Sequence, residues 1–583
     1  MRRPILIFAA LFAVLSAAFV APGASAKRQV LMPGVTYEKQ VQFTMHGPVV
    51  VHVLTASRPG GLYSLQPALS NEAIPGTETL SAIQRRLSTG ATTAGVSGDT
   101  FAADGRPSGI LMRDGTLDHR PLSTRSSIGI DFAGALHVDR VTLLGTVQGS
   151  GERRKFSLVD EPAPANGFAL FTPVWGAATP ATPGSFEIVL RPFPRATTNT
   201  ELRGPVVQAA SGGGTAIPPD GVVVVARGTA AERLQAEAPV GQSVAVRLVL
   251  SPSWAGMVGA VGGGPVLVRK GRPVFRPAEA FSTDLLALRQ PRAAVGQLAD
   301  GRMVLVAVDG GWPGFSTGLT NYELAQTLVR LGAVTGAALG AGAQTGLAVD
   351  GKLATRPPAK GGEQPISDAL LVSYAGVYAP EPTEPVLSPN GDNVGEVESL
   401  AYKVVRPSTV TAQLLGPAGA VVPIFSGLAQ PGTYPFTWNG TTPEGAAYPE
   451  GRWRLVANAT DDLGRVSTIE RAFSLNLTLC CARTIGPALR VPRAAKRGVA
   501  QFTLAHPAAT SARIETSSGV VLRKLGRSPR AAAGGIAVGW DGRTDSGALV
   551  YSGRYRVRIT AQNELGSVSL TAPFTVRRVA RAR

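Results

Sequence analysis

The chain has 583 residues, enough for three or four domains at roughly 150 residues each. Hydrophobic residues make up 44%, which is enough for several cores and excludes wholesale disorder. The formal net charge is +18, and the only two cysteines are adjacent, which excludes both a disulfide-rich scaffold and a Cys-x-x-Cys metal site.

The first 26 residues have the pattern of a secretory signal peptide. Arg2 and Arg3 precede an apolar run at 5–20, and Ala-Ser-Ala at 24–26 supplies the small residues of a cleavage site. The run is too short to span a bilayer comfortably, and no later stretch approaches the roughly 20 apolar residues of a spanning helix. We expect a mature protein that is secreted or held in the cell envelope, with no transmembrane span after cleavage.

Export changes what the positive charge implies. A pI of about 10.4 is typical of nucleic-acid-binding proteins. The chain, however, has no zinc-ligand spacing, no aromatic RNA-binding motif and no basic helix. We expect no nucleic-acid partner and instead an anionic carbohydrate or cell-wall polymer. The basic tail at 579–583 is expected to be a solvated terminus.

Residues 27–377 are predicted to form one strand-rich domain of mixed α/β character. Apolar, β-branched runs such as 48–54 and 303–308 indicate buried strands. The best helix follows Thr320, because Thr320 and Glu323 have the spacing of a capping box and leucines then recur on one helical face. The histidines form no His-x-His or His-Glu-x-x-His pair, so we expect no metal site and no cofactor.

Glycine-rich segments of this block follow one another in a distinctive order. They read AGVSGDTF, GGGPVLV, PRAAVG, VDG and STGLT and lie at 94–101, 262–268, 291–296, 308–310 and 316–320. The order resembles that of the phosphodiester glycosidase family, which releases sugars from phosphodiester links. The resemblance covers roughly residues 30–374 and rests on the order more than on any single motif.

The resemblance implies a site in which Asp99 and Asp309 supply carboxylates and Arg292 clamps a phosphate. Oxocarbenium-like transition states are usually handled by a carboxylate pair, and the arginine fork matches a phosphate. The alternatives are turn-forming aspartates beside glycine and a structural arginine. The neighbouring residues then implied to contact substrate are Ser97, Gly98, Gly264, Gly318 and Thr320.

One family motif has changed in this chain. The Leu-Asp-Gly-Gly-Gly-Ser stretch of the family aligns with 339–344, so Gly340 replaces its aspartate and Gln344 its serine. Two hypotheses stay open. The protein hydrolyses sugar-phosphodiester groups of an extracellular or cell-wall glycan, or it is a catalytically degenerate protein that binds glycans or organises the envelope. Whether it is an enzyme is not decided by the sequence.

The C-terminal third contains an internal repeat with an offset of 102 residues. Trp438 corresponds to Trp540, and each precedes an Asn-Gly or Asp-Gly turn signal. The repeat predicts two Ig-like β-sandwiches at 378–482 and 488–578. The expected fold class is therefore α+β, a strand-rich mixed α/β N-terminal domain followed by two Ig-like β-sandwich domains.

Both repeats resemble the Ig-like module of flagellar hook-capping proteins, which implies a spacer or docking role. The first also has the motif Ser-Pro-Asn-Gly-Asp at 388–392. Around it Asn390, Asp392, Glu396 and Glu398 predict an Asx-turn or, alternatively, oxygen ligands for calcium. The redox state of Cys480 and Cys481 is left open.

Overall fold

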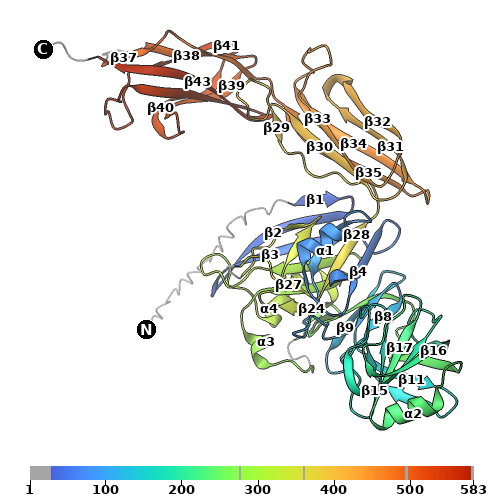
Figure 1. Ribbon diagram of the computed structural model, residues 1–583. Helices are drawn as coiled ribbons and strands as arrows, with labels where there is room; N and C mark the ends of the chain where they lie inside the picture. Colours follow the sequence, from blue (N-terminus) through green and yellow to red (C-terminus); the bar gives the residue numbers. More distant parts are fainter. Residues whose placement is uncertain (1–27, 275–277, 359–360, 493–496, 580–583) are drawn as a thin grey trace, which may run out of the picture.

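The computed structural model describes residues 28–274, 278–358, 361–492 and 497–579 (Figure 1). Strands dominate and the helices are few and short, which confirms the predicted fold class. The predicted signal peptide and residues 580–583 of the predicted tail lie outside the described residues. The domain limits given above stay predictions. No helix among the described residues is long and apolar enough to cross a membrane.

Two sheets pack against each other in the N-terminal domain. The first has eight strands in the order β1 (Gln29–Met32), β2 (Val35–Thr44), β3 (Gly47–Ala56), β23 (Met303–Val308), β22 (Arg292–Leu298), β24 (Ala333–Ala341), β20 (Val266–Arg269) and β21 (Arg272–Pro273). The second has five, in the order β26 (Lys352–Leu353), β25 (Leu347–Val349), β6 (Thr92–Ser97), β28 (Asp368–Tyr374) and β4 (Tyr63–Leu69). Their shared core includes Leu54, Leu305, Val96 and Leu370.

Helix α4 (Asn321–Arg330) covers the other face of the eight-stranded sheet. The Thr320 side chain accepts a hydrogen bond from the Glu323 N–H, and the Glu323 carboxylate accepts one from the Thr320 N–H. The predicted helix and its capping box are thus confirmed. Leu328 packs with Val304 and Val306 of β23 in a separate core. The remaining short elements of this domain are η1 (Ser70–Glu72), β5 (Glu78–Thr79), α1 (Leu80–Leu87), α3 (Thr283–Ala287) and β27 (Pro365–Ile366).

A third sheet leads from this core to a unit inserted at 142–251, drawn in teal and green in Figure 1. The third sheet has the order β10 (Leu136–Arg140), β9 (Ser126–Asp131), β19 (Met257–Gly262), β7 (Leu111–Arg113) and β8 (Thr116–His119). The inserted unit has eight strands and one helix. They are β12 (Arg154–Phe156), β11 (Thr142–Gln148), β18 (Ser243–Ser251), β16 (Glu201–Gly213), β15 (Ala181–Leu190), β17 (Val222–Arg227), β14 (Phe168–Phe171), β13 (Leu158–Val159) and α2 (Thr229–Glu237). The inserted unit and the strands next to it enclose a second large hydrophobic core, which the sequence did not indicate.

The two repeats form similar pairs of sheets. The first Ig-like unit has β30 (Glu398–Val404) and β33 (Gly432–Trp438) in one sheet, opposite β29 (Val386–Leu387), β35 (Val466–Leu475), β34 (Gly451–Asp461), β31 (Ser408–Leu415) and β32 (Val421–Ala429), with η2 (Pro417–Gly419) between strands. The second Ig-like unit has β36 (Leu479–Thr484), β38 (Arg497–Leu504) and β41 (Gly534–Trp540), opposite β37 (Leu489–Val491), β43 (Gly566–Arg578), β42 (Gly553–Asn563), β39 (Ala508–Thr516) and β40 (Val521–Ala531). Trp438 and Trp540 end equivalent strands and are both buried, as the repeat predicts.

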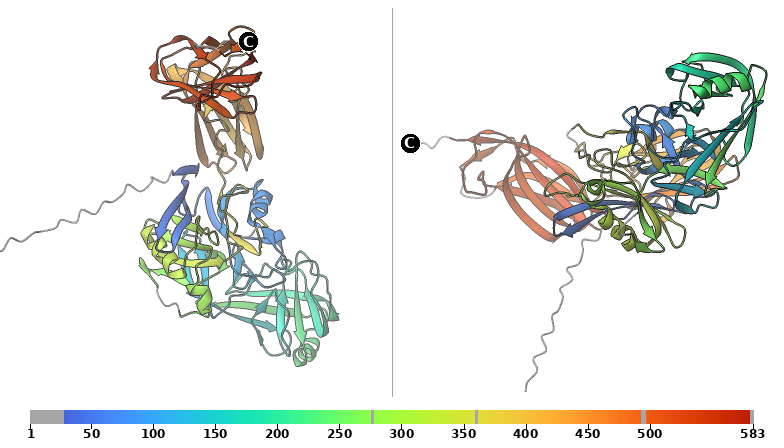
Figure 2. Two further views of the ribbon diagram at one scale, coloured as in Figure 1. Left: turned by 90° about the vertical axis from the view of Figure 1, so that its left-hand side faces the viewer. Right: turned by 90° about the horizontal axis from the view of Figure 1, so that it is seen from below.

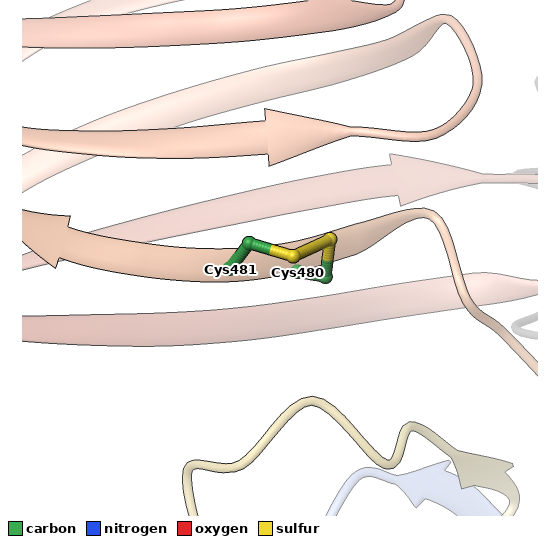
Figure 3. Close-up of a disulfide and its surroundings, with 2 residues drawn as sticks. All are labelled: Cys480 and Cys481. Atoms are coloured by element: carbon green, nitrogen blue, oxygen red, sulfur yellow. A yellow bond between two sulfur atoms is a disulfide. The ribbon is translucent and has the colours of Figure 1, made fainter.

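The first Ig-like unit stands between the N-terminal domain and the second unit (Figure 2). Where the two units meet, Cys480 and Cys481 are joined by a disulfide in β36 (Figure 3). The 388–392 loop forms the predicted Asx-turn, because the Asp392 N–H donates to Asn390 Oδ1. The Glu396 carboxylate accepts three backbone N–H groups of the same loop. Within the described residues no group of three or more His, Cys, Asp or Glu is placed to hold a metal ion.

Candidate functional site

The end of β6 brings Asp99 beside a second buried aspartate, Asp368. Strands β6 and β28 are antiparallel, with Ser97 opposite Ala369, so the start of β28 lies next to the turn that follows β6. There the Asp99 N–H donates to Asp368 Oδ1 at 2.9 Å. Neither carboxyl Oδ2 has a hydrogen-bond partner within the described residues, and both side chains are buried.

The surroundings raise the pKa of both carboxyl groups. Burial raises the pKa of Asp368 to about 8, and the adjacent Asp99 adds to the effect. Burial also raises the pKa of Asp99, but the charge of Arg125 and hydrogen bonds from Thr100 act against it. At neutral pH we therefore expect Asp368 to hold a proton. A protonated carboxyl group next to a second aspartate is an arrangement found in acid–base sites.

Arg125 is the cation of this cluster. Its guanidinium donates to Thr100 Oγ1 at 3.0 Å and lies 3.4 Å from Asp99 Oδ1. It also stacks over the Phe281 ring, 4.4 Å from the ring centroid. The buried Nε of Arg125 has no hydrogen-bond partner within the described residues. The cluster therefore keeps one arginine donor, besides the two carboxyl oxygens, that no described group satisfies.

Glycines make room for the two carboxyl groups. A Cβ at Gly98 would lie 1.8 Å from Asp368 Oδ1, and one at Gly262 would lie 2.1 Å from Asp99 Oδ2. No side chain could stand at either position without displacing an aspartate. Gly340 is also close, since its N–H donates to the Gly98 carbonyl at 2.6 Å. A Cβ at Gly340 would lie 2.9 Å from that same oxygen, so this backbone leaves no room for the aspartate of the family motif.

Arg292 lies near this cluster in the sheet but faces away from it. Its Nε donates to the Leu319 carbonyl, and one terminal nitrogen donates to the carbonyls of Leu285 and Leu288. Burial lowers the pKa of Arg292 to about 10. Because alternate residues of a strand share a face, Arg292 points to the same side as Ala294, which packs beside α4. The guanidinium holds the segments before β22 and α4 together.

Asp309 faces the opposite side of the sheet and belongs to a buried chain of hydrogen bonds. Its Oδ2 lies 3.0 Å from Nε2 of His52, whose Nδ1 lies 2.7 Å from the Tyr37 hydroxyl. Oδ1 accepts a hydrogen bond from the Arg356 N–H at 2.9 Å. Burial, together with the charge of Asp309, raises the pKa of Tyr37 to about 12. Asp309 and Arg292 thus lie on different faces, and the structure does not bring them together with Asp99 in one pocket.

The predicted substrate contacts also have partners within the protein. Ser97 and Gly346 exchange hydrogen bonds, with Ser97 Oγ as one acceptor. The Gly264 N–H donates to the Ala338 carbonyl, and the Gly318 carbonyl accepts from Arg289. Thr320 is the N-cap of α4. Their roles toward a substrate remain predictions.

A cavity of about 540 Å³ lies elsewhere in the domain, where β4, β7 and β8 face the inserted unit. Its charged lining comprises Glu72, Arg113, Asp114, Asp118 and Arg195. None of the residues predicted from the sequence lines it. The cavity and the aspartate pair are therefore separate features of the N-terminal domain.

Sequence reasoning missed Asp368 and Arg125. Asp368 is 269 positions from Asp99, and only the pairing of β6 with β28 makes them neighbours. Arg125 directly precedes β9, a basic residue at the start of a buried strand. That combination was a signal that could have pointed to it, because a charge at the edge of an apolar run needs a partner.

Comparisons with known proteins match two regions of the chain. Residues 196–373 match the family model of phosphodiester glycosidase, and residues 487–564 match that of the FlgD Ig-like domain. Both resemblances inferred from the sequence are thereby confirmed. The matched Ig-like region falls within the second unit and leaves the first outside it.

Individual relatives cover parts of the chain. An uncharacterised SPbeta prophage-derived protein of Bacillus subtilis, YomE, is 32% identical over 108 residues, which are 18% of this chain and 16% of that protein. The crystal structure of a hypothetical protein from Synechocystis has a TM-score of 0.51 at 24% identity, covering 61% of this chain and 64% of that one, and shows a shared fold. The zebrafish N-acetylglucosamine-1-phosphodiester alpha-N-acetylglucosaminidase catalytic domain has a TM-score of 0.32 at 13% identity, over 60% of this chain and 86% of that one.

Proposed function

We propose that this chain, with its phosphodiester glycosidase-type region, is an exported protein that acts on sugar-phosphodiester groups of extracellular or cell-wall glycans. The observation that carries the proposal is the buried pair of Asp99 and Asp368, which are joined through the Asp99 N–H and whose Oδ2 atoms have no hydrogen-bond partner within the described residues. Arg125 adds a cation within reach of the same place. Export is supported by the signal-peptide pattern of residues 1–26.

Asp368 and Asp99 have different roles in the proposed hydrolysis. Asp368 donates its proton to the phosphate oxygen as the bond from that oxygen to the anomeric carbon breaks. The Asp99 carboxylate stabilises the positive charge that develops on the sugar. Water then adds to the anomeric carbon, and the proton it loses returns to the carboxyl pair. The products are a free sugar and a phosphate monoester.

Arg125 takes the role of anion holder in this proposal. Its unsatisfied Nε is a donor for a phosphate oxygen, and its stacking on Phe281 fixes the plane of the guanidinium. Arg292 supports the site from behind, since its donors are engaged by backbone carbonyls. Asp309 likewise orders the neighbouring backbone through Arg356 and His52.

A second function, binding without hydrolysis, is favoured by two observations. The family aspartate is absent at Gly340, and the backbone there is too close to Gly98 to accept one. Asp99 is also enclosed by Gly109 and Gly262, which leaves its side chain almost without exposure. In this case the domain is a degenerate member of its family that holds an anionic glycan.

The test is the release of sugar from a small, soluble phosphodiester glycoside by the chain without residues 1–26. Asp368→Asn keeps an oxygen that can accept from the Asp99 N–H but has no acid proton to give. It should lower kcat/KM by roughly 10²–10⁴-fold. Asp160→Asn, at a fully buried aspartate of the inserted unit, is the matched control and should leave the rate within a few-fold.

The pH dependence gives a second readout. Activity should fall as pH rises through about 8, because Asp368 then loses its proton. The unfolded chain loses that proton near pH 4, so between about 4 and about 8 it binds fewer protons than the native protein. The free energy of unfolding should therefore decrease as pH rises over this range, and Asp368→Asn should remove that slope.

Each outcome is decisive. An unchanged rate in Asp368→Asn would show that Asp368 is not the acid. Tight binding of the glycoside with no sugar released by the natural chain would favour the degenerate protein. If the natural chain neither binds nor hydrolyses the glycoside, the proposed substrate class is wrong.

A further inference from the structure

The positive charge of the protein is concentrated in the second Ig-like unit. Residues 488–578 contain 15 basic and 4 acidic side chains, a net charge of +11. Residues 378–482, the first unit, contain 6 basic and 10 acidic side chains, a net charge of −4. Two units of the same fold therefore present opposite charge, and the fold itself requires neither.

Four of the 15 basic side chains lie together on one face of the sheet formed by β42, β39 and β40. Arg513 of β39 is directly opposite Arg558 of β42 on one side and Lys524 of β40 on the other. Two residues along the same face, Ser511 is opposite Thr560 and Arg527. Neighbouring strands are about 4.8 Å apart, so the three cations form a continuous row beside two hydroxyl groups. We call these six residues the basic face.

The basic face lines a hollow of about 460 Å³, together with Ala512, Leu525 and Gly526. Glu515 accepts hydrogen bonds from Arg513 and Arg558, and also from Arg556. One carboxylate thus serves three guanidinium groups. The side chains of Lys524 and Arg527 form no ion pair or hydrogen bond within the part of the chain that the structure describes.

Such a row of like charges works against the sheet in which it lies. Like charges directly opposite each other on neighbouring strands are destabilising, and Glu515 offsets only part of the excess. The first unit avoids the problem. By strand register, Gln413, Val456, Pro423 and Ser426 stand where the second unit has Arg513, Arg558, Lys524 and Arg527. The cations are thus particular to the second unit and are not a requirement of the Ig-like fold.

We propose that the basic face binds a phosphodiester-linked polyanion of the extracellular space. Arginine forks and hydroxyl groups are the donors that suit phosphate oxygens, and a row of cations across three strands matches a ligand with repeated charges. The class of polymer is taken from the proposed function, but the site is distant in the chain from the aspartate pair. The second unit then anchors the protein on the polymer that the N-terminal domain contacts.

The experiment measures binding of the chain without residues 1–26 to immobilised poly(glycerol phosphate). Lys524→Glu/Arg527→Glu alters the two cations that have no partner within the described residues and leaves the Glu515 cluster intact. The dissociation constant should rise by about tenfold or more. Arg247→Glu/Arg452→Glu makes the same change of net charge at exposed arginines of the inserted unit and the first Ig-like unit, and should change binding less than about twofold. Binding by the natural chain should also weaken with added salt.

Other results would overturn the proposal. An equal loss of affinity in both double variants would show that binding depends on net charge and not on a particular site. No loss of affinity in either variant would show that the basic face does not bind the polymer. Tighter binding to single-stranded DNA or to vesicles of anionic phospholipid than to poly(glycerol phosphate) would mean a different class of partner. Hydrolysis of the small glycoside should be unchanged in Lys524→Glu/Arg527→Glu, so a failure of this proposal is distinguishable from a failure of the proposed function.

Discussion

The two Ig-like units show how one scaffold is used in two ways. Each consists of a small sheet opposite a five-stranded sheet, and each ends a strand of the small sheet with a buried tryptophan, Trp438 or Trp540. Their interiors are built from apolar and aromatic side chains. Their surfaces differ, with a net charge of −4 in the first and +11 in the second. Because the fold depends on the interior, the outer faces are free to carry separate tasks.

A single strand position shows the difference. Arg471 of β35 is opposite Leu455, and at the corresponding place in β43 the residue opposite Val557 is Ala572. Arg471 is buried and donates to the carbonyls of Ala379, Val30 and Leu31. It therefore ties the first unit to the linker and to β1 of the N-terminal domain. The second unit has no such side chain there, and its arginines lie on open faces instead.

The largest effect should come from removing the hydrogen bonds that Arg471 donates to the linker and to β1. Arg471→Met keeps much of the side-chain volume but leaves three backbone carbonyls without their donor, at about 1–3 kcal/mol each. We expect the free energy of unfolding to fall by roughly 3–5 kcal/mol, and the contact between β1 and the first unit to loosen. Denaturant unfolding and hydrogen exchange of residues 29–32 measure the two effects.

The matched control is Arg454→Met in the adjacent strand. Arg454 pairs with Glu470, and both side chains are half exposed, so the loss should be about 0–1 kcal/mol. A loss in Arg471→Met no larger than in this control would mean that the first unit docks by other contacts. The inferred difference, in which Arg471 ties the first unit to the N-terminal domain and the second unit has no such side chain, would then not matter for stability.

Each Ig-like unit contains a buried glutamate. The two glutamates should give the stabilities of the two units opposite dependences on pH. Burial raises the pKa of Glu398, although hydrogen bonds from Thr383 and Glu384 act against it. Burial also opposes ionisation of Glu515, but its bonds from three arginines hold its pKa below the ordinary glutamate value. The stabilisation from Glu515 is present above the unfolded pKa of about 4.3 and is lost as pH falls through the folded value. The contribution of Glu398 has the opposite sign and is lost as pH rises.

Hydrogen exchange resolved by peptide can follow both units in one sample. From pH 6 to 3.5, protection of β39 and β42 should decrease more steeply than protection of β30. Glu515→Gln should flatten the response of the second unit and leave the first unit unchanged, and Glu398→Gln should do the reverse. Parallel loss of protection in both units would contradict this assignment.

Local patterns were sufficient to predict the parts of the fold that are built from neighbouring residues. The capping box at Thr320 and the repeat that aligns Trp438 with Trp540 each depend on residues close in sequence or on a fixed offset. Both were confirmed. The inserted unit was not foreseen, because it contains apolar strand runs such as β17 that are like those of the surrounding domain, and no linker or change of composition marks its ends.

The candidate site was only partly predictable for the same physical reason. The turn after β6 was recognised, and Asp99 lies there as expected. Its partner Asp368 begins a strand far along the chain, and no local pattern distinguishes it from other aspartates at strand ends. Arg292 is the first residue of β22, and the direction of its side chain depends on the register of β22 in the sheet, which sequence alone does not give.

The smallest effect should come from the contact that joins the two Ig-like units. The Asn390 amide donates to the Ser569 carbonyl of the second unit at 3.0 Å, and Asn476 of the first bonds to Asn563 of the second. Asn390→Ala removes the bond to Ser569 and also the bonds to the Asp392 N–H and Ser388 Oγ within the 388–392 loop, and it should cost about 1–2 kcal/mol. Asn458→Ala, whose partner Thr468 lies in the same unit, is the control.

If the junction couples the units, Asn390→Ala should separate their unfolding transitions in a denaturant series followed by hydrogen exchange, whereas Asn458→Ala should not. Coincident transitions in Asn390→Ala would show that the remaining contacts between the two Ig-like units, among them the Asn476–Asn563 bond, are sufficient to couple their unfolding without the bond from the 388–392 loop.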